Sequence, residues 1–223
     1  MTSVVDSLRN SSAFRTALQL HQTDKIDEAI SHYEALIHEH AHKDVLHLLA
    51  IAYAQTGQYQ QALSACQRAL THDDQNSHFL ATLGNIYRHL CDYAQAEKAL
   101  STALSQEPSN ISAQHNLGLV YYQQDAIAQA ARCFQNILAQ IPSHAEAHFN
   151  FALCCIRQSN ISQAKSALTE ASVYAPKHPR ALYQLAQIHH EEQAYGQART
   201  LYEKHLDNFP HHAEALLNYS AIL

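Results

Sequence analysis

The sequence predicts an all-α fold, an α-solenoid of stacked helical hairpins, from three periodic features. Six alanines recur along the chain at intervals of 33 or 34 residues. A glycine or alanine stands 12 positions before each of them, and a proline stands 12 positions after four of them. A period of this length is typical of stacked hairpins, because one hairpin cannot bury its apolar face alone. The periodic residues are Ala29, Ala62, Ala96, Ala130, Ala164 and Ala198, preceded by Ala17, Ala50, Gly84, Gly118, Ala152 and Ala186 and followed by Pro108, Pro142, Pro176 and Pro210.

Each unit of this pattern predicts two helices. Two apolar stripes at helical spacing are separated by a short polar turn, such as residues 55–58. The small residues are expected where the two helices cross, since a larger side chain would push the backbones apart. A proline marks the end of the second helix because it cannot continue it. The expected units are residues 10–42, 43–76, 77–110, 111–144, 145–178 and 179–212, with a partial seventh at 213–223, all in one domain spanning 1–223.

Large side chains are expected to fill the gaps beside the small residues. In the first helix of a unit this position is held by Tyr53, Tyr87 and Tyr121. In the second helix it is held by Tyr33, Leu100, Phe134, Leu168 and Tyr202. Cys66 and Cys155 take equivalent positions, so we expect both in the core, where thiols behave as small hydrophobes.

The two ends of the array differ from its middle. The first unit lacks the proline and runs one residue short, as expected for a terminal repeat with one side facing water. At the other end the sequence stops 11 residues into a seventh unit, with Leu216, Tyr219, Ile222 and Leu223 at apolar positions. Two interpretations stay open, a short closing helix or a chain cut from a longer protein, and we favour the second.

Units three and four carry the motifs most similar to a known family. Unit three reads LGNIY at 83–87 and unit four reads LGLVY at 117–121, each followed by the alanine and proline of the period. This pattern resembles the tetratricopeptide repeat, from about residue 10 to the end of the chain. The resemblance implies a right-handed superhelix in which the first helix of every unit lines a concave groove.

Composition limits the classes of function. The formal net charge of −6 opposes binding to nucleic acid, which depends on neutralising phosphates. Residues 1–10 lack the basic start and apolar run of a secretory signal, and no stretch of the sequence could span a bilayer. We therefore expect a cytoplasmic protein that binds neither nucleic acid nor a membrane. The five cysteines suit a reducing compartment, and because they include no C-x-x-C pair, neither a redox motif nor a zinc site is indicated.

Histidine is abundant, with 18 residues, so a metal site has to be weighed. His38 and His42 stand four residues apart, a spacing that can present two imidazoles to one ion. No H-E-x-x-H pattern occurs, and we expect histidines on solvated faces and in core positions, with no metal and no cofactor. Affinity for a ligand is predicted to vary between about pH 5 and 7, because the expected groove positions include His78, His89, His115 and His190.

The resemblance also implies a binding surface. Its register places an amide at the sixth position of four consecutive units, with another amide one helical turn along in unit three. These residues are Asn116, Asn150, Gln184 and Asn218, and Asn85. They resemble the asparagine ladder of the O-GlcNAc transferase repeats, whose amides bind the backbone of an extended peptide. A carboxamide suits this role because it both donates and accepts hydrogen bonds. The alternative is that these amides only decorate a solvated face.

Specificity for a ligand would come from other residues of the same surface. Arginines and aromatic residues are the usual anchors of an interface. The anchors expected here are Arg88, Tyr122, Arg157, Arg180 and Tyr183. The chaperone-tail clamp of the family is not expected, because its three cationic positions are missing from this chain.

Two classes of function follow. The first is a non-catalytic scaffold that binds an extended peptide or a partner protein, with self-association through the C-terminal helix as a further option. The alternative is the recruiting arm of a glycosyltransferase or methyltransferase whose catalytic domain lies beyond residue 223. No enzyme is expected within these residues, since no phosphate loop or G-x-S-x-G motif occurs. The chain also resembles the six-repeat pilotins of pilus assembly, which are lipidated, but it has no lipobox.

Overall fold

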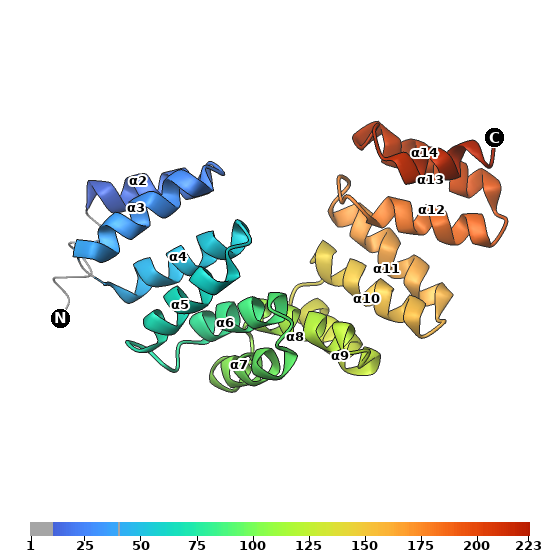
Figure 1. Ribbon diagram of the computed structural model, residues 1–223. Coiled ribbons are helices and arrows are strands. Elements are labelled where there is room, and N and C mark those ends of the chain that lie inside the picture. Colours follow the sequence, from blue (N-terminus) through green and yellow to red (C-terminus); the bar gives the residue numbers. More distant parts are fainter. Residues whose placement is uncertain (1–10, 40) are drawn as a thin grey trace. The chain divides into compact units, whose positions relative to one another are not determined.

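The computed structural model describes residues 11–39 and 41–223 (Figure 1). Thirteen helices and no strand are found in this part of the chain. The helices belong to two compact units, Met1–Val120 and Tyr121–Leu223, and each is described by itself. Residue 10, the expected start of the first repeat, and His40 lie outside the described residues.

The first unit contains three helical hairpins and the start of a fourth. Their helices are α2 (Ser12–Gln22), α3 (Ile26–Glu39), α4 (Lys43–Gln55), α5 (Tyr59–Leu70), α6 (Ser77–His89), α7 (Tyr93–Gln106) and α8 (Ile111–Gln123), the last of which continues into the second unit. Each hairpin packs its two helices together, and α3 packs on α4 as α5 does on α6. The stacked hairpins expected from the sequence are therefore confirmed here.

The second unit continues the same alternation. Its helices are α9 (Ile127–Gln140), α10 (Ala145–Arg157), α11 (Ile161–Tyr174), α12 (Ala181–Glu191), α13 (Tyr195–Asn208) and α14 (Ala213–Ser220). Helices α10 and α11 form one hairpin, α12 and α13 form the next, and α14 packs on α13. The helix expected in the partial seventh repeat is thus present as α14, and the all-α solenoid is confirmed.

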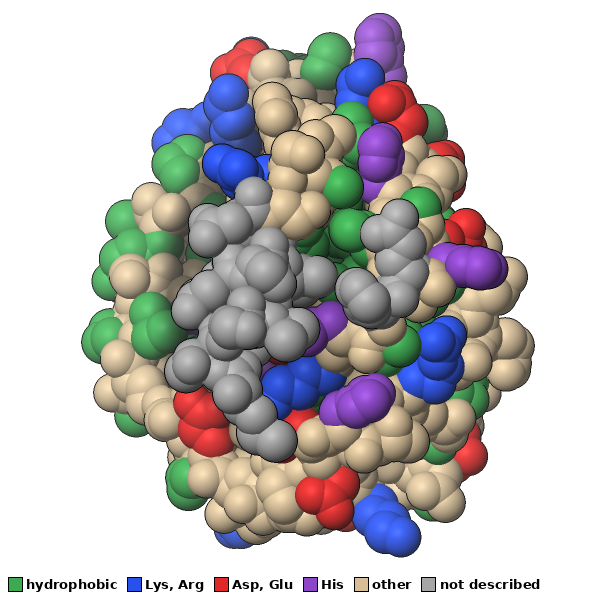
Figure 2. Space-filling view, turned by 90° about the vertical axis from the view of Figure 1, so that its left-hand side faces the viewer, with side chains coloured by type: hydrophobic (Ala, Val, Ile, Leu, Met, Phe, Trp, Pro, Cys, Tyr) green, Lys and Arg blue, Asp and Glu red, His purple; other side chains and the backbone are tan. Residues whose placement is uncertain are grey.

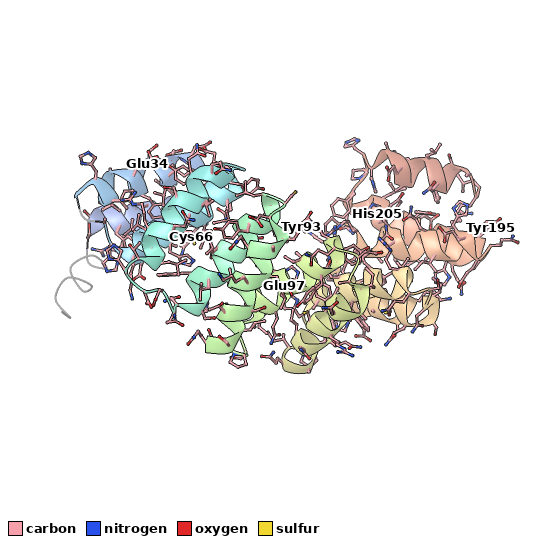
Figure 3. The ribbon with its side chains drawn as sticks, turned by 60° about the horizontal axis from the view of Figure 1, so that its bottom comes forward. Glu34, Cys66, Tyr93, Glu97, Tyr195 and His205 are labelled. Atoms are coloured by element: carbon pink, nitrogen blue, oxygen red, sulfur yellow. The ribbon has the colours of Figure 1, made fainter. Side chains whose placement is uncertain are left out.

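The cores of both units contain most of the expected residues, whereas Tyr53, Tyr87 and Tyr121 of the first helices are only half-buried. All six periodic alanines are fully buried. Tyr33, Leu100, Phe134, Leu168 and Tyr202, the expected fillers of the second helices, are also fully buried. Cys66, shown on α5 in Figure 3, and Cys155 are buried as expected. Burial raises the pKa of the Cys66 thiol to about 12, so this cysteine stays protonated and acts as an apolar filler.

Gly84 marks a close crossing of α6 over α7. A β-carbon built at this position would lie 2.4 Å from Cγ of Leu100. Leu100 is itself fully buried, so its side chain has little room to move aside. The close approach explains why this unit has glycine at a position where four of the other units have alanine.

Every turn inside a hairpin contains one residue in the left-handed conformation. These residues are Asp24, Gly57, Cys91, Asp125, Ser159 and Gln193, with φ between 59° and 77°. The residue after each one donates its backbone N–H to a carbonyl five positions earlier, as from Gln58 to Tyr53 at 2.8 Å. This is the Schellman motif, which satisfies the last carbonyls of the first helix. Only Gly57 is of the residue type that this motif favours, so the motif could not be predicted from the residue types at the other five turns.

The first helices also share a repeated cap. The last position of each repeat holds histidine or asparagine: His42, Asn76, Asn110, His144, His178 and His212. Five of these side chains accept a backbone N–H at the start of the following helix, as Nδ1 of His144 does from Ala147 at 3.1 Å. An imidazole nitrogen can accept only when it carries no proton, so the three capping histidines hold their Nδ1 lone pair toward the helix.

We predict opposite effects for two glycine substitutions. Gly84→Ala should lower the free energy of unfolding by about 1–2 kcal/mol, because the steric cost of overpacking exceeds the gain in helix propensity. Gly196→Ala should raise it by up to about 1 kcal/mol, since its added methyl meets no atom within 4 Å. Urea unfolding of the two variants measures both values. Equal stabilisation by the two substitutions would contradict the close crossing.

Replacing a capping histidine separates its cap from its other properties. His144→Ala should lower the free energy of unfolding by about 1 kcal/mol through loss of the cap. His144→Asn should lower it by less than half as much, because Asn76 and Asn110 cap the same helix position in other repeats. Thermal unfolding compares the variants. An asparagine variant as unstable as the alanine variant would show that the cap is not what His144 contributes.

Candidate functional site

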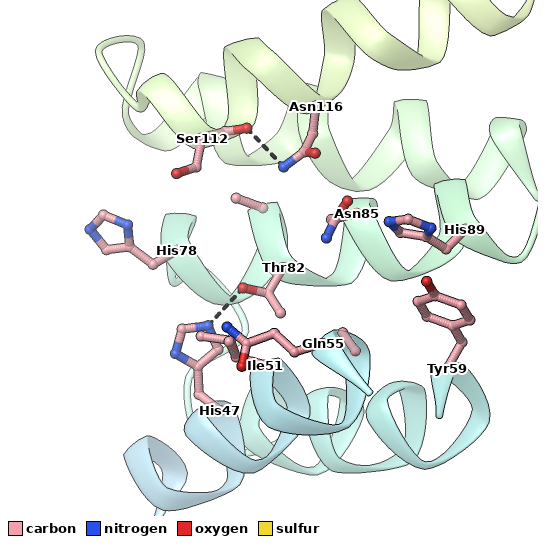
Figure 4. Close-up of a pocket in the computed structure, with 12 residues that line it drawn as sticks. His47, Ile51, Gln55, Tyr59, His78, Thr82, Asn85, His89, Ser112 and Asn116 are labelled. Atoms are coloured by element: carbon pink, nitrogen blue, oxygen red, sulfur yellow. Dashed lines mark hydrogen bonds between the residues drawn. The ribbon is translucent and has the colours of Figure 1, made fainter. Parts of the chain in front are cut away.

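The first unit contains a pocket of about 590 Å³ on its α4, α6 and α8 side (Figure 4). Eleven of the twelve residues that line it come from these three helices, at positions where the sequence places the groove. They are His47, Ile51, Ala54, Gln55, His78, Ala81, Thr82, Asn85, His89, Ser112 and Asn116, and Tyr59 of α5 completes the wall. This lining is rich in amides, hydroxyls and imidazoles, and it contains no carboxylate.

The orientation of the Asn85 amide is fixed by a neighbour. Its Oδ1 atom accepts a hydrogen bond of 2.9 Å from the guanidinium of Arg88. Arginine can only donate, so the atom facing it must be the amide oxygen. The Nδ2 group of Asn85, with its two N–H donors, is therefore left for the pocket.

The orientation of the Asn116 amide is fixed in the opposite sense. Its Nδ2 group donates to the backbone carbonyl of Ser112, 3.0 Å away, as the dashed line in Figure 4 marks. A carbonyl can only accept, so the atom that remains free is the Asn116 oxygen. The pocket thus contains one amide held as a donor and one held as an acceptor, on neighbouring first helices.

His47 and Thr82 form the floor between these helices. Nε2 of His47 lies 2.8 Å from Oγ1 of Thr82, and the imidazole packs against the ring of Phe79 with centroids 4.5 Å apart. Burial is the main cause that lowers the pKa of His47 from 6.5 to about 4, with a smaller contribution from His78 and an opposing one from Asp44. His47 is therefore neutral across the physiological range.

In the second unit, Asn150 and Arg180 already have partners. Asn150 is buried, and its amide lies 3.4 Å from a carboxylate oxygen of Glu146. The same carboxylate pairs with Arg180 at 3.1 Å and with Nε2 of His178 at 2.9 Å. The Arg180 guanidinium also lies 4.4 Å above the ring centre of Phe149. A ligand would have to displace these contacts before it could bind the Asn150 amide.

Tyr183 and Asn218 are likewise joined to each other. The Tyr183 hydroxyl receives hydrogen bonds from Asn218 at 3.3 Å and from Gln187 at 2.9 Å, and it donates to Glu214 at 3.2 Å. This network connects α12 with α14. Gln184, by contrast, is half-buried, and no hydrogen-bond partner is found for its side chain among the described residues.

The remaining expected anchors form a small cluster of their own. The Arg157 guanidinium is paired with Asp125 and lies 5.9 Å from the ring centre of Tyr122. The structure therefore separates the ten expected ligand residues into two groups. Asn85 and Asn116 line an open pocket, with Arg88 directly behind Asn85, whereas most of the others are held in contacts within the second unit. Ligand binding by any of them stays a prediction.

A second pocket, of about 530 Å³, lies in the second unit and is mainly apolar. It is formed by the start of α12 and the segment that joins α13 to α14. Its lining is Pro179, Arg180, His205, Asn208, Phe209, Pro210, His211 and His212. His205 and His212 bond to each other through Nε2 and Nδ1 at 2.7 Å. Burial, and then the neighbouring His212, lower the pKa of His205.

The other histidines are distributed over many environments. In the described part of the chain no group of three histidine, cysteine or acidic residues is placed to hold a metal ion. On the face shown in Figure 2, histidine, basic and acidic side chains are interspersed. His42, weighed above as a metal ligand, instead caps α4.

Two features of the site do not follow from the sequence pattern. One is the contact between His47 and Thr82, although both residues occupy groove positions. The other is the difference between the amides that have partners in the second unit and those that face a pocket. The caps at the last position of each repeat were visible in the sequence as a period of histidine and asparagine.

In the part of the chain that the structure describes, no helix has the length and hydrophobicity that a membrane span requires.

Comparison with family models gives three matches. Two of the models are described as tetratricopeptide repeat, one matching residues 54–119 and the other residues 14–77 and 156–213. The third, anaphase-promoting complex, cyclosome, subunit 3, matches residues 89–171. A search of curated protein sequences finds no match.

Several solved structures are similar to this chain at low sequence identity. The pilF protein of Pseudomonas aeruginosa has a TM-score of 0.75 at 20% identity, over 81% of this chain and 82% of that one. The APC/C hetero-tetramer Cut9–Hcn1 has a TM-score of 0.83 at 18% identity, over 93% of this chain but only 42% of that one. YrrB, described as a TPR protein with an unusual peptide-binding site, has a TM-score of 0.60 at 21% identity, over 82% and 95%. At these identities the similarity shows the fold alone.

The buried imidazole of the pocket predicts a pH-dependent stability. Between pH 6.5 and about 4 the unfolded chain binds a proton at His47 that the folded chain does not, so stability falls as the pH falls. At pH 5 the loss from this group should be about 2 kcal/mol relative to pH 7.5. His47→Gln, which keeps a hydrogen-bonding group toward Thr82, should lose correspondingly less. Urea unfolding at the two pH values tests this, and identical losses for both proteins would contradict it.

Proposed function

Because this chain belongs to the tetratricopeptide repeat family, we propose that it is a non-catalytic scaffold that binds an extended segment of a partner protein. We place the primary contact in the α4–α6–α8 pocket of the first unit. The observation that carries this proposal is the opposite orientation of the Asn85 and Asn116 amides. Each is fixed by a neighbour that can act in only one way, Arg88 as a donor and the Ser112 carbonyl as an acceptor.

The two amides match the chemistry of a peptide backbone. An extended peptide presents a carbonyl and an N–H in turn along its length. Asn85 can donate to the carbonyl and Asn116 can accept from the N–H, whatever side chains the peptide carries. Both side chains are half-buried in the free protein, so they lose little further freedom when a ligand binds.

Energetics require more than these two bonds. Each hydrogen bond to a neutral amide contributes about 0.5–1.5 kcal/mol, whereas association costs about 4–15 kcal/mol. The remaining affinity has to come from side chains of the ligand that fill the pocket against Ile51, Ala54 and Tyr59. A dissociation constant in the micromolar range is the natural expectation for such a site.

The proposed groove differs in position from the one expected from the sequence. The first three repeats have Arg15, Leu48 and Thr82 at the ladder position, so the sequence predicts backbone binding only in the C-terminal half of the chain. In the second unit, however, Asn150 is bonded to Glu146 and Asn218 to Tyr183. We therefore assign the first contact to the open amides of the first unit. The ladder residues of the second unit would bind only after their present partners are displaced.

The experiment starts from peptide selection on the full chain. A random display library of about twelve-residue peptides is selected against the immobilised protein, and the dissociation constant of an enriched peptide is measured by fluorescence anisotropy. Asn85→Ala with Asn116→Ala should weaken binding by about tenfold or more, because two backbone hydrogen bonds are lost.

The control is Asn136→Ala, which removes an exposed amide of α9 that is not among the residues lining the pocket. This variant should bind the peptide as the original protein does. Equal affinity of the double variant and the original protein would refute the proposed site. The absence of any enriched peptide would refute peptide binding by this chain more generally.

A further inference from the structure

Arg88 is a charged residue whose surroundings do not neutralise it. It lies in the last turn of α6, and its Nε atom is buried without a hydrogen-bond partner. Among the described residues no carboxylate lies within ion-pair distance of its guanidinium. Burial lowers the pKa of this arginine, and the groups that oppose the shift are the hydroxyls of Tyr59 and Tyr93, which are neutral at physiological pH, and not carboxylates. A half-buried cation without a counter-ion is costly unless an anion reaches it.

Arg88 is connected to the pocket through two lining residues. Its guanidinium donates to Oδ1 of Asn85 at 2.9 Å and to Nε2 of His89 at 2.7 Å. Arginine has no acceptor, so both neighbours must turn an acceptor atom toward it. Their donors, the two N–H groups of Asn85 and the Nδ1–H of His89, therefore point away from the cation. We call the part of the pocket formed by Asn85 and His89 the Arg88 corner. It presents hydrogen-bond donors, and the positive charge of Arg88 lies beside it.

The groups packed around this corner add no negative charge at neutral pH. Tyr59 of α5 stacks on His89 with ring centroids 4.6 Å apart, and Tyr93 stands at the start of α7, as labelled in Figure 3. The nearest ion pair of a lining residue joins His78 to Glu107 at 3.8 Å, at the opposite end of α6. Beside Arg88, the described residues that line the pocket therefore provide hydrogen-bond donors and no carboxylate.

We propose that this corner selects an acidic side chain of the bound segment, a glutamate or aspartate adjacent to the residue whose carbonyl meets Asn85. This inference rests on the proposed function and specifies its ligand. One N–H of Asn85 donates to the peptide carbonyl and the other to the carboxylate. Arg88 supplies the charge from behind and fixes the amide, which makes it a positioning residue.

The test compares two peptides that differ in one charge. A peptide enriched from the random library and its glutamate-to-glutamine counterpart are titrated against the full chain and three variants. The original protein should prefer the glutamate peptide by about tenfold, an attraction typical of charges a few ångströms apart near a protein surface. Arg88→Gln should reduce this preference to about twofold or less, and Arg88→Lys should restore part of it.

Arg68→Gln is the matched control, because it removes one exposed positive charge from α5 of the same unit. It should leave the preference near tenfold. Enriched peptides without an acidic residue, or an unchanged preference in Arg88→Gln, would overturn this inference while peptide binding itself stands. A library that yields no enriched peptide would overturn both. Since the readout is a ratio of two affinities, partial misfolding of a variant does not imitate the expected result.

Discussion

The crossing of paired helices at small residues is the constraint on which the rest of this structure depends. At these crossings the small alanines and glycines let two backbones approach closely, and at Gly84 an added β-carbon would collide with Leu100. The close approach leaves large side chains such as Tyr33 and Tyr202 to fill the space beside each crossing. Because the crossing recurs at a nearly constant interval, each first helix has the same face left for a ligand.

Much of the fold could be predicted because its determinants are periodic and local. An alanine at a crossing or a proline after a helix acts through residues only a few positions away. The left-handed turns were harder to see, since Cys91 and Gln193 adopt a conformation that their residue type does not favour. Backbone hydrogen bonding and helix packing impose the left-handed conformation at these two residues, so the sequence alone does not predict it.

The candidate site was predictable only in outline. The repeat register placed Asn85, Asn116 and Asn150 on the groove face of the first helices, because this assignment depends only on the position of a residue within its repeat. Whether an amide is free depends on partners about one repeat away, such as Glu146 with Arg180 or Tyr183 with Asn218. These pairings come from three-dimensional neighbours that differ between repeats, so the period cannot give them. Among the described residues of the first unit, Asn85 and Asn116 bond to Arg88 and Ser112 of their own helices, and each keeps its other amide atom for the pocket.

The recurring caps and turns bear on how such a chain can change its length. The first helices α4, α6, α8, α10 and α12 each begin after histidine or asparagine at the same repeat position and end in the same left-handed turn. Both junctions are satisfied by residues within one repeat or directly beside it. A duplicated 34-residue repeat would therefore bring its own helix cap and its own left-handed turn to any junction between repeats. The fold can grow by tandem duplication, and each added layer brings one more surface for selection to act on.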